Sequence, residues 1–89
     1  MTDQEFLDAA ARGDTEAVQA ALDAGQKADT TDAYGNTALM MACSRAQRDV
    51  CKALLAAGAN TEHKNQFGLG PRQWIDWADN DSAIRNLIG

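Results

Sequence analysis

The chain has little of the material from which catalytic centres and metal sites are built. It holds one histidine, one proline and two cysteines in 89 residues, and neither cysteine belongs to a CxxC pair. A zinc site would have to gather its ligands from distant positions. The sequence also lacks a GxSxG nucleophile motif, a glycine-rich phosphate loop and clustered Asp/His pairs. We therefore expect a protein that is not an enzyme and that holds no cofactor and no metal ion.

Long apolar runs and basic stretches are absent too. No apolar run reaches the ~18 residues that span a membrane. The N-terminus, MTDQEFLDAA, carries acids where a secretory signal has basic residues, and it contains no apolar core. A nucleic-acid interface needs a basic stripe, whereas this chain has a net charge of −5. We expect a cytoplasmic protein that binds neither membranes nor nucleic acids.

Acidic residues are concentrated in the N-terminal third. Residues 1–32 carry eight acids and two bases, a net charge of −6, whereas residues 33–64 carry two acids and four bases, a net charge of +2. This difference has two interpretations. The acidic third is a solvated end that keeps the protein soluble, or it steers the protein toward a basic partner.

What the sequence does contain is an internal repeat with a period of 33 residues. Gly35 falls on Gly68 with an aromatic residue before each, and Leu22 falls on Leu55. Glycine at these corners provides the positive φ that a tight turn demands. Each period then offers two short stretches with apolar residues at helical spacing. We expect helices at residues 3–11, 15–24, 38–45, 48–57, 71–78 and 82–88.

Capping residues mark the ends of several of these helices. Thr2 and Glu5 form a capping-box pattern, Thr37 is a favourable N-cap residue, and Gly58 follows the fourth helix as a C-terminal cap. The two cysteines lie in apolar helical patterns, and we expect them to be reduced thiols in the core. The predicted core includes Phe6, Leu7, Ala9, Ala10, Val18, Ala21, Leu22, Cys43, Val50, Cys51, Leu54 and Leu55.

Three motifs of the repeat carry a resemblance to a known family. Residues 37–42, TALMMA, resemble the Thr-Pro-Leu-His-x-Ala core of ankyrin repeats, which have the same period. Residues 32–37, DAYGNT, and 54–60, LLAAGAN, are similar to the family's Asp-x-x-Gly-x-Thr opening and Leu-Leu-x-x-Gly-Ala-Asp/Asn ending. Met40 departs from the pattern, because it stands where the family usually has a histidine that hydrogen-bonds neighbouring loops.

The resemblance implies an all-α ankyrin-repeat solenoid of three stacked helix-turn-helix units with short β-turn corners. The whole chain, residues 1–89, is expected to form a single domain. Residues 1–31 would be the N-terminal capping repeat, residues 32–64 the central repeat and residues 65–89 the C-terminal capping repeat.

The resemblance also implies how such a fold works. Ankyrin units have no common active site and bind another macromolecule, usually a protein, through corner tips and first helices. The residues at matching positions are Arg12, Tyr34, Asn36, Arg45, Lys64, Gln66, Phe67, Leu69 and Trp77. Aromatic residues and arginine are enriched at binding hot spots. The structural alternative is that Tyr34 and Phe67 cover a neighbouring corner and that Trp77 seals the end of the stack.

We therefore expect a non-catalytic module, monomeric by itself, that binds a partner protein through its corner tips and concave inner-helix face. The alternative is an acidic inhibitor or immunity-type protein that occludes a partner enzyme, and the charge of the first third motivates it. That alternative predicts binding to a basic site that weakens steeply with added salt.

Overall fold

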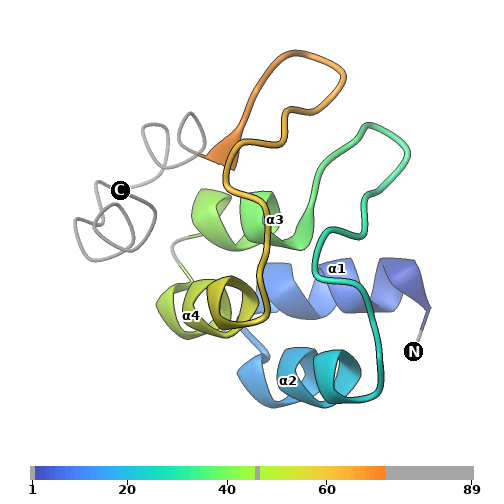
Figure 1. Ribbon diagram of the computed structural model, residues 1–89, viewed down its shortest axis with the longest axis vertical. Helices are drawn as coiled ribbons and strands as arrows, with labels where there is room; N and C mark the ends of the chain where they lie inside the picture. The colour runs from blue at the N-terminus through green and yellow to red at the C-terminus, as the bar shows by residue number, and fades with distance from the viewer. Residues whose placement is uncertain (1, 46, 72–89) are drawn as a thin grey trace.

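Helices make up most of the regular structure in the computed structural model, which describes residues 2–45 and 47–71 (Figure 1). The described residues form α1 (Asp3–Arg12), α2 (Thr15–Asp23), α3 (Ala38–Ser44) and α4 (Arg48–Ala56). Each boundary lies within one residue of its expected place, so the first four predicted helices are confirmed. The helices expected at 71–78 and 82–88 lie, apart from Pro71, outside the described residues, and so does Trp77.

Extended pairing is limited to the base of a corner. Across the described ranges, the one β contact is an isolated bridge between Thr31 and Thr37. The predicted all-α stack of helix-turn-helix units is therefore confirmed. None of the described helices has the length and apolar content of a membrane span.

The helices begin and end at the expected capping residues. The Thr2 hydroxyl accepts a hydrogen bond from the Glu5 N–H at 3.2 Å, and the Glu5 carboxylate accepts one from the Thr2 N–H at 3.0 Å. Gly13 ends α1 with a φ of +80°. Thr37 caps α3 through the Met40 N–H at 3.3 Å, and the Met40 sulfur accepts from the Thr37 N–H at 3.4 Å. Met40 stands where the family usually has a histidine, and it forms these hydrogen bonds within its own repeat unit.

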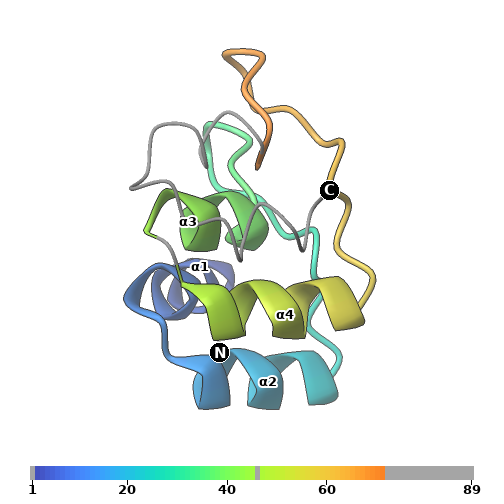
Figure 2. The same ribbon diagram turned by 90° about the vertical axis from the view of Figure 1, so that its left-hand side faces the viewer.

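The helices stack in two layers, with α1 against α3 and α2 against α4 (Figure 2). The buried residues of α1 and α3 include four alanines, Ala9, Ala10, Ala38 and Ala42. Small side chains at a contact allow helices to approach closely. The buried core consists of Phe6, Leu7, Ala9, Ala10, Val18, Ala21, Ala38, Leu39, Ala42, Cys43, Val50, Cys51 and Leu54. Most of the predicted core is therefore buried, and the inner helices α1 and α3 contribute most of it.

Two leucines predicted as core are only half-buried. Leu54 is fully buried, whereas Leu22 and Leu55 pack against the edge of the core and remain partly exposed. Leu22 and Leu55 share one repeat position, so the same exposure recurs in both outer helices. Helical spacing marks the whole apolar face of a helix and does not rank positions across it.

Candidate functional site

The first corner, residues 32–37, is built around the carboxylate of Asp32. Its Oδ1 accepts hydrogen bonds from the backbone N–H groups of Tyr34 and Asn36, both at 2.9 Å, and its Oδ2 accepts one from Asn36 Nδ2 at 3.2 Å. The Gly35 N–H donates to the Asp32 carbonyl at 3.1 Å. Aspartate commonly closes a turn in this way. The corner therefore keeps its shape through its own side chain and leaves the Tyr34 ring outside.

The second corner, residues 65–70, repeats this construction with asparagine in place of aspartate. Asn65 Oδ1 accepts hydrogen bonds from the N–H groups of Phe67 at 2.9 Å and Leu69 at 3.0 Å. The Gly68 N–H donates to the Asn65 carbonyl at 3.0 Å. The same backbone geometry therefore presents Phe67 one period after Tyr34.

Hydrogen bonds also join the two corners to each other. The Gln66 N–H donates to the Tyr34 carbonyl at 2.9 Å, and Gln66 Nε2 donates to the Ala33 carbonyl at 2.7 Å. Asn65 Nδ2 donates to Asn36 Oδ1 at 2.7 Å. These three contacts link residues about one period apart, so the corners lie side by side as a linked pair (Figure 1).

Gly35 lies where the two corners come close. A Cβ atom at this position would lie 3.3 Å from both Asn65 Cα and Gln66 N, and the φ of +81° is one that other residues rarely adopt. A ring nitrogen of His63 lies 3.2 Å from the Gly35 carbonyl oxygen. The single histidine of the chain is thus part of the contact between the corners.

The linked corners hold a pair of aromatic rings in solvent. Tyr34 is 57% exposed and Phe67 is 68% exposed, and they are the large hydrophobic residues that stand out on the described surface. Their ring centroids lie 6.3 Å apart with the ring planes at 27°, which is a stacked arrangement. The alternative to a binding role is that these rings only cover a neighbouring corner. The two rings do contact each other, yet more than half of each stays open to solvent.

The remaining predicted residues fall into two groups. Arg12, Arg45, Lys64 and Gln66 are exposed, whereas Asn36 and Leu69 are half-buried. Arg12 lies 3.7 Å from the Asp14 carboxylate in a solvent-exposed ion pair. Gln66 and Asn36 use their side-chain amides in the contacts between the corners. The rings, Arg45 and Lys64 are therefore exposed without an ion pair among the described residues, while the two amides support the corners.

Most acidic residues of the N-terminal third form hydrogen bonds with other residues of the chain. Seven of the eight accept a hydrogen bond from another described residue, and Glu16 is the exception within the described part of the chain. Several of these bonds cap helices or close turns. The seven are Asp3, Glu5, Asp8, Asp14, Asp23, Asp29 and Asp32.

The two cysteines lie in the core, as expected for reduced thiols. Cys43 Sγ and Cys51 Sγ are 3.9 Å apart, both side chains are buried, and neither forms a disulfide. The hydrogen bond with Cys51 and the burial of the site raise the pKa of Cys43. Because the thiolate is the reactive form of cysteine, this pair does not fit a nucleophile. Within residues 2–45 and 47–71, no three His, Cys, Asp or Glu residues gather as metal ligands do.

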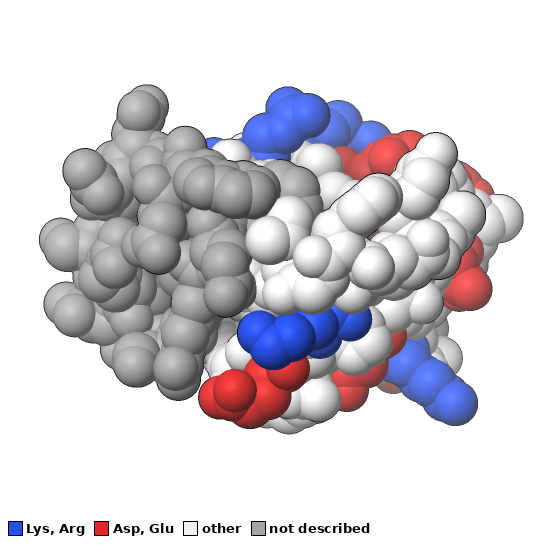
Figure 3. All heavy atoms as spheres, turned by 90° about the horizontal axis from the view of Figure 1, so that it is seen from above, with Lys and Arg blue, Asp and Glu red and all other residues white. Residues whose placement is uncertain are grey.

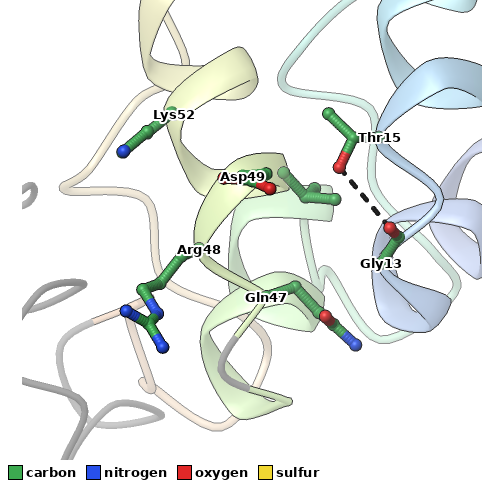
Figure 4. Close-up of a pocket in the computed structure, with 7 residues that line it drawn as sticks. Gly13, Thr15, Gln47, Arg48, Asp49 and Lys52 are labelled. Atoms are coloured by element: carbon green, nitrogen blue, oxygen red, sulfur yellow. Dashed lines mark hydrogen bonds between the residues drawn. The ribbon is translucent and has the colours of Figure 1, made fainter.

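A hollow of about 400 Å³ lies between the N-terminal ends of α2 and α4 (Figure 4). Gly13, Thr15, Gln47, Arg48, Asp49, Val50 and Lys52 line it. Arg48 and Lys52 extend away from Gly13 and Thr15, and the Thr15 hydroxyl donates to the Gly13 carbonyl at 3.4 Å (Figure 4). The hollow lies at the join between the two outer helices α2 and α4.

Two residues that support the site are not among the predicted site residues. Asn65 builds the second corner and bridges to the first, and its position one period after Asp32 indicates that role. Gln47 donates to the Ala11 carbonyl at 3.1 Å and lies where a Cβ of Gly13 would collide with it. That contact joins two units and leaves no local pattern in the sequence.

Comparison with known families agrees with the geometry. A family model described as ankyrin repeats, in three copies, matches residues 6–68. The matched range contains all of α2, α3 and α4, most of α1 and the first corner, and it reaches Gly68 in the second corner. A comparison with curated proteins found no match.

Proposed function

The chain belongs to the ankyrin repeat family, and we propose that it is a non-catalytic module that binds a partner protein through its linked corners. Ankyrin repeats are generally protein–protein interaction modules, and the family is typically non-catalytic. The binding surface of the proposal is the corner face, which we define as Tyr34, Phe67, Lys64 and Arg45. Arg12 adjoins it on α1, and Gln66, Asn36 and Leu69 support it. The sequence prediction adds Trp77, which lies outside the described residues.

The exposed Tyr34–Phe67 pair is the observation that carries this proposal. Large apolar rings exposed to water are characteristic of interaction sites when they gather in one place. Here the rings stand on corners that are fixed by hydrogen bonds within and between the turns. A surface that is already ordered loses less entropy on binding. The pair therefore has both the chemistry and the rigidity of a protein-binding surface.

The alternative of an acidic inhibitor draws less support from the described residues. Its argument was the net charge of the N-terminal third, and most of those carboxylates accept hydrogen bonds within the chain. Capping and turn closure account for acids at such positions without a partner. We therefore propose partner-protein binding through the linked corners over the inhibitor alternative.

Site-directed photo-crosslinking tests the proposal. The photoreactive residue p-benzoylphenylalanine replaces Phe67 in one version of the full chain and Gln19, which is exposed on α2, in a control version. After irradiation in cells of the native host, we expect a protein that crosslinks from position 67 and not from position 19, identified by mass spectrometry. Crosslinks that are the same from both positions, or that form from position 19 alone, would contradict the proposal.

A further inference from the structure

We propose that the segment bound at the corner face is acidic. It would be an extended stretch of a partner protein, with an apolar side chain against the Tyr34–Phe67 pair and carboxylates beside Lys64 and Arg45. This inference rests on the proposed function, because it specifies the chemistry of the partner that the corner face binds.

Two cations of the corner face favour an acidic partner. Arg45 and Lys64 are both exposed, and neither forms an ion pair with another residue in the described part of the chain. The C-terminus of a helix attracts a cation by itself, which accounts in part for Arg45 at the end of α3. Lys64 lies outside any helix, two residues before Gln66, and has no such explanation. Lys64 is therefore the more informative of the two.

The carboxylate of the first corner also favours an acidic partner, because its hydrogen bonds are made within the turn. Asp32, the acid of the first corner, is turned into the turn and accepts three hydrogen bonds there. The view onto the corners shows an uncharged surface with Lys and Arg side chains on two sides, and acidic side chains lie beside one of these groups and at the margin (Figure 3). A partner that approaches the rings from this side meets exposed cations as well as the rings.

The negative net charge of the chain does not prevent an acidic segment from binding at close range. The chain as a whole carries −5, which repels an acidic partner at a distance. Exposed charges are screened over about 8 Å at physiological ionic strength. A carboxylate in contact with the corner face therefore responds mainly to Lys64 and Arg45, and carboxylates in interfaces pair favourably with arginine.

The dimensions of the site define the length of the segment. Helix α3 begins at Ala38, directly after the first corner, and ends at Ser44, next to Arg45. At 1.5 Å per residue, Arg45 lies roughly 10 Å along the helix from the base of the corner. An extended chain advances about 3.3 Å per residue, so about three residues cover the distance from the base of the corner to Arg45, and the residues that contact the rings come in addition. The proposed occupant is a short linear segment with an apolar anchor and acidic neighbours.

Selection from a random peptide library tests the charge preference directly. A phage-displayed library of peptides is selected on the full chain, and the binders are sequenced and measured by titration. We expect binders with an excess of Asp and Glu around an apolar residue. Lys64→Glu should weaken them about tenfold or more, and Lys64→Gln should give an intermediate loss. Lys52→Glu, the same charge change at an exposed position of α4, should change affinity by about twofold or less.

The outcomes separate this inference from the proposed function. Neutral or basic binders that are lost with Tyr34→Ser and Phe67→Ser would overturn the acidic preference and leave the corner face as the binding surface. Equal losses from Lys64→Glu and Lys52→Glu would overturn it as well. Binders that are insensitive to the two serine substitutions, or a library that yields no binder, would contradict the proposed function itself.

Discussion

The helical layers and the corners of this molecule are stabilised by different interactions. In the helices, buried apolar side chains such as Phe6, Leu39 and Leu54 form a continuous core. In the corners, side-chain oxygens of Asp32 and Asn65 hold the backbone, and large apolar rings point outward. The residues that stabilise the fold are therefore separate from the exposed rings that we propose for recognition. We order four expected effects on these two parts of the molecule from the largest to the smallest.

The largest effect should come from the helical layer. Leu54→Ala removes a fully buried side chain and should reduce the free energy of unfolding by about 3–5 kcal/mol. Leu55→Ala, at a half-buried neighbour, should reduce it by clearly less. Urea unfolding followed by circular dichroism measures both changes. Equal losses at the two positions would show that the edge of the stack contributes as much as its core.

A backbone substitution in the corner should come next. Gly35→Ala places a Cβ against Asn65 and Gln66 and also strains a positive φ, so it should cost about 2–3 kcal/mol. Gly58→Ala has a φ of +87° but no atom within 4 Å of the added Cβ, and should cost about 1 kcal/mol. The difference between the two unfolding free energies reports the close approach of the corners. No difference would mean that the corners have room between them.

A smaller change isolates the bridge between the corners. Asn65→Asp keeps the oxygen that accepts from Phe67 and Leu69 but loses the donor to Asn36, and should cost about 1 kcal/mol. Asn65→Ala loses the acceptor as well and should cost about 1 kcal/mol more. Both are measured by urea unfolding. If Asn65→Asp were as costly as Asn65→Ala, the turn and its bridge could not be treated as separate contributions.

The smallest effect lies at the start of α1. Hydrogen bonds from the Thr2 backbone N–H and then from its hydroxyl lower the pKa of Glu5 from its ordinary value of 4.5. A lowered folded-state pKa gives stability that is present above the unfolded value and is lost as pH falls through the folded value. The stability difference between the wild type and Glu5→Gln should therefore be constant above about pH 5.5 and shrink below 4.5. A stability difference that grew as the pH fell would contradict the lowered pKa of Glu5.

The helices and turns could be predicted from sequence because their signals are local. Thr2, Glu5 and Thr37 act within three residues of themselves, and Gly35 follows an aromatic residue in a turn. The linkage between corners could not be predicted in this way. Gln66 meets Tyr34 only because two turns one period apart lie side by side, and that depends on how the units stack.

The candidate site also contains residues that the sequence predicts well and residues whose role depends on how the units stack. Tyr34 and Phe67 were predicted as partner-binding residues from their repeat positions, and the structure finds them exposed and stacked. Gln66 was predicted beside them, yet its side-chain amide donates to the Ala33 carbonyl and holds the corners together. Residue type and repeat position predict which residues belong to such a surface. Only the packed structure distinguishes side chains that remain open from those that support them.

We infer that the corner rings serve recognition and contribute little to the stability of the fold. The most direct test measures stability and partner affinity on one protein, the double variant Tyr34→Ser and Phe67→Ser, with Gln19→Ser as the control. We expect its unfolding free energy to stay within about 1 kcal/mol of the wild type, because both rings are largely solvated. Affinity for the crosslinked partner should fall by about 1–3 kcal/mol, roughly 5- to 150-fold. A large loss of stability with unchanged affinity per folded molecule would contradict the account.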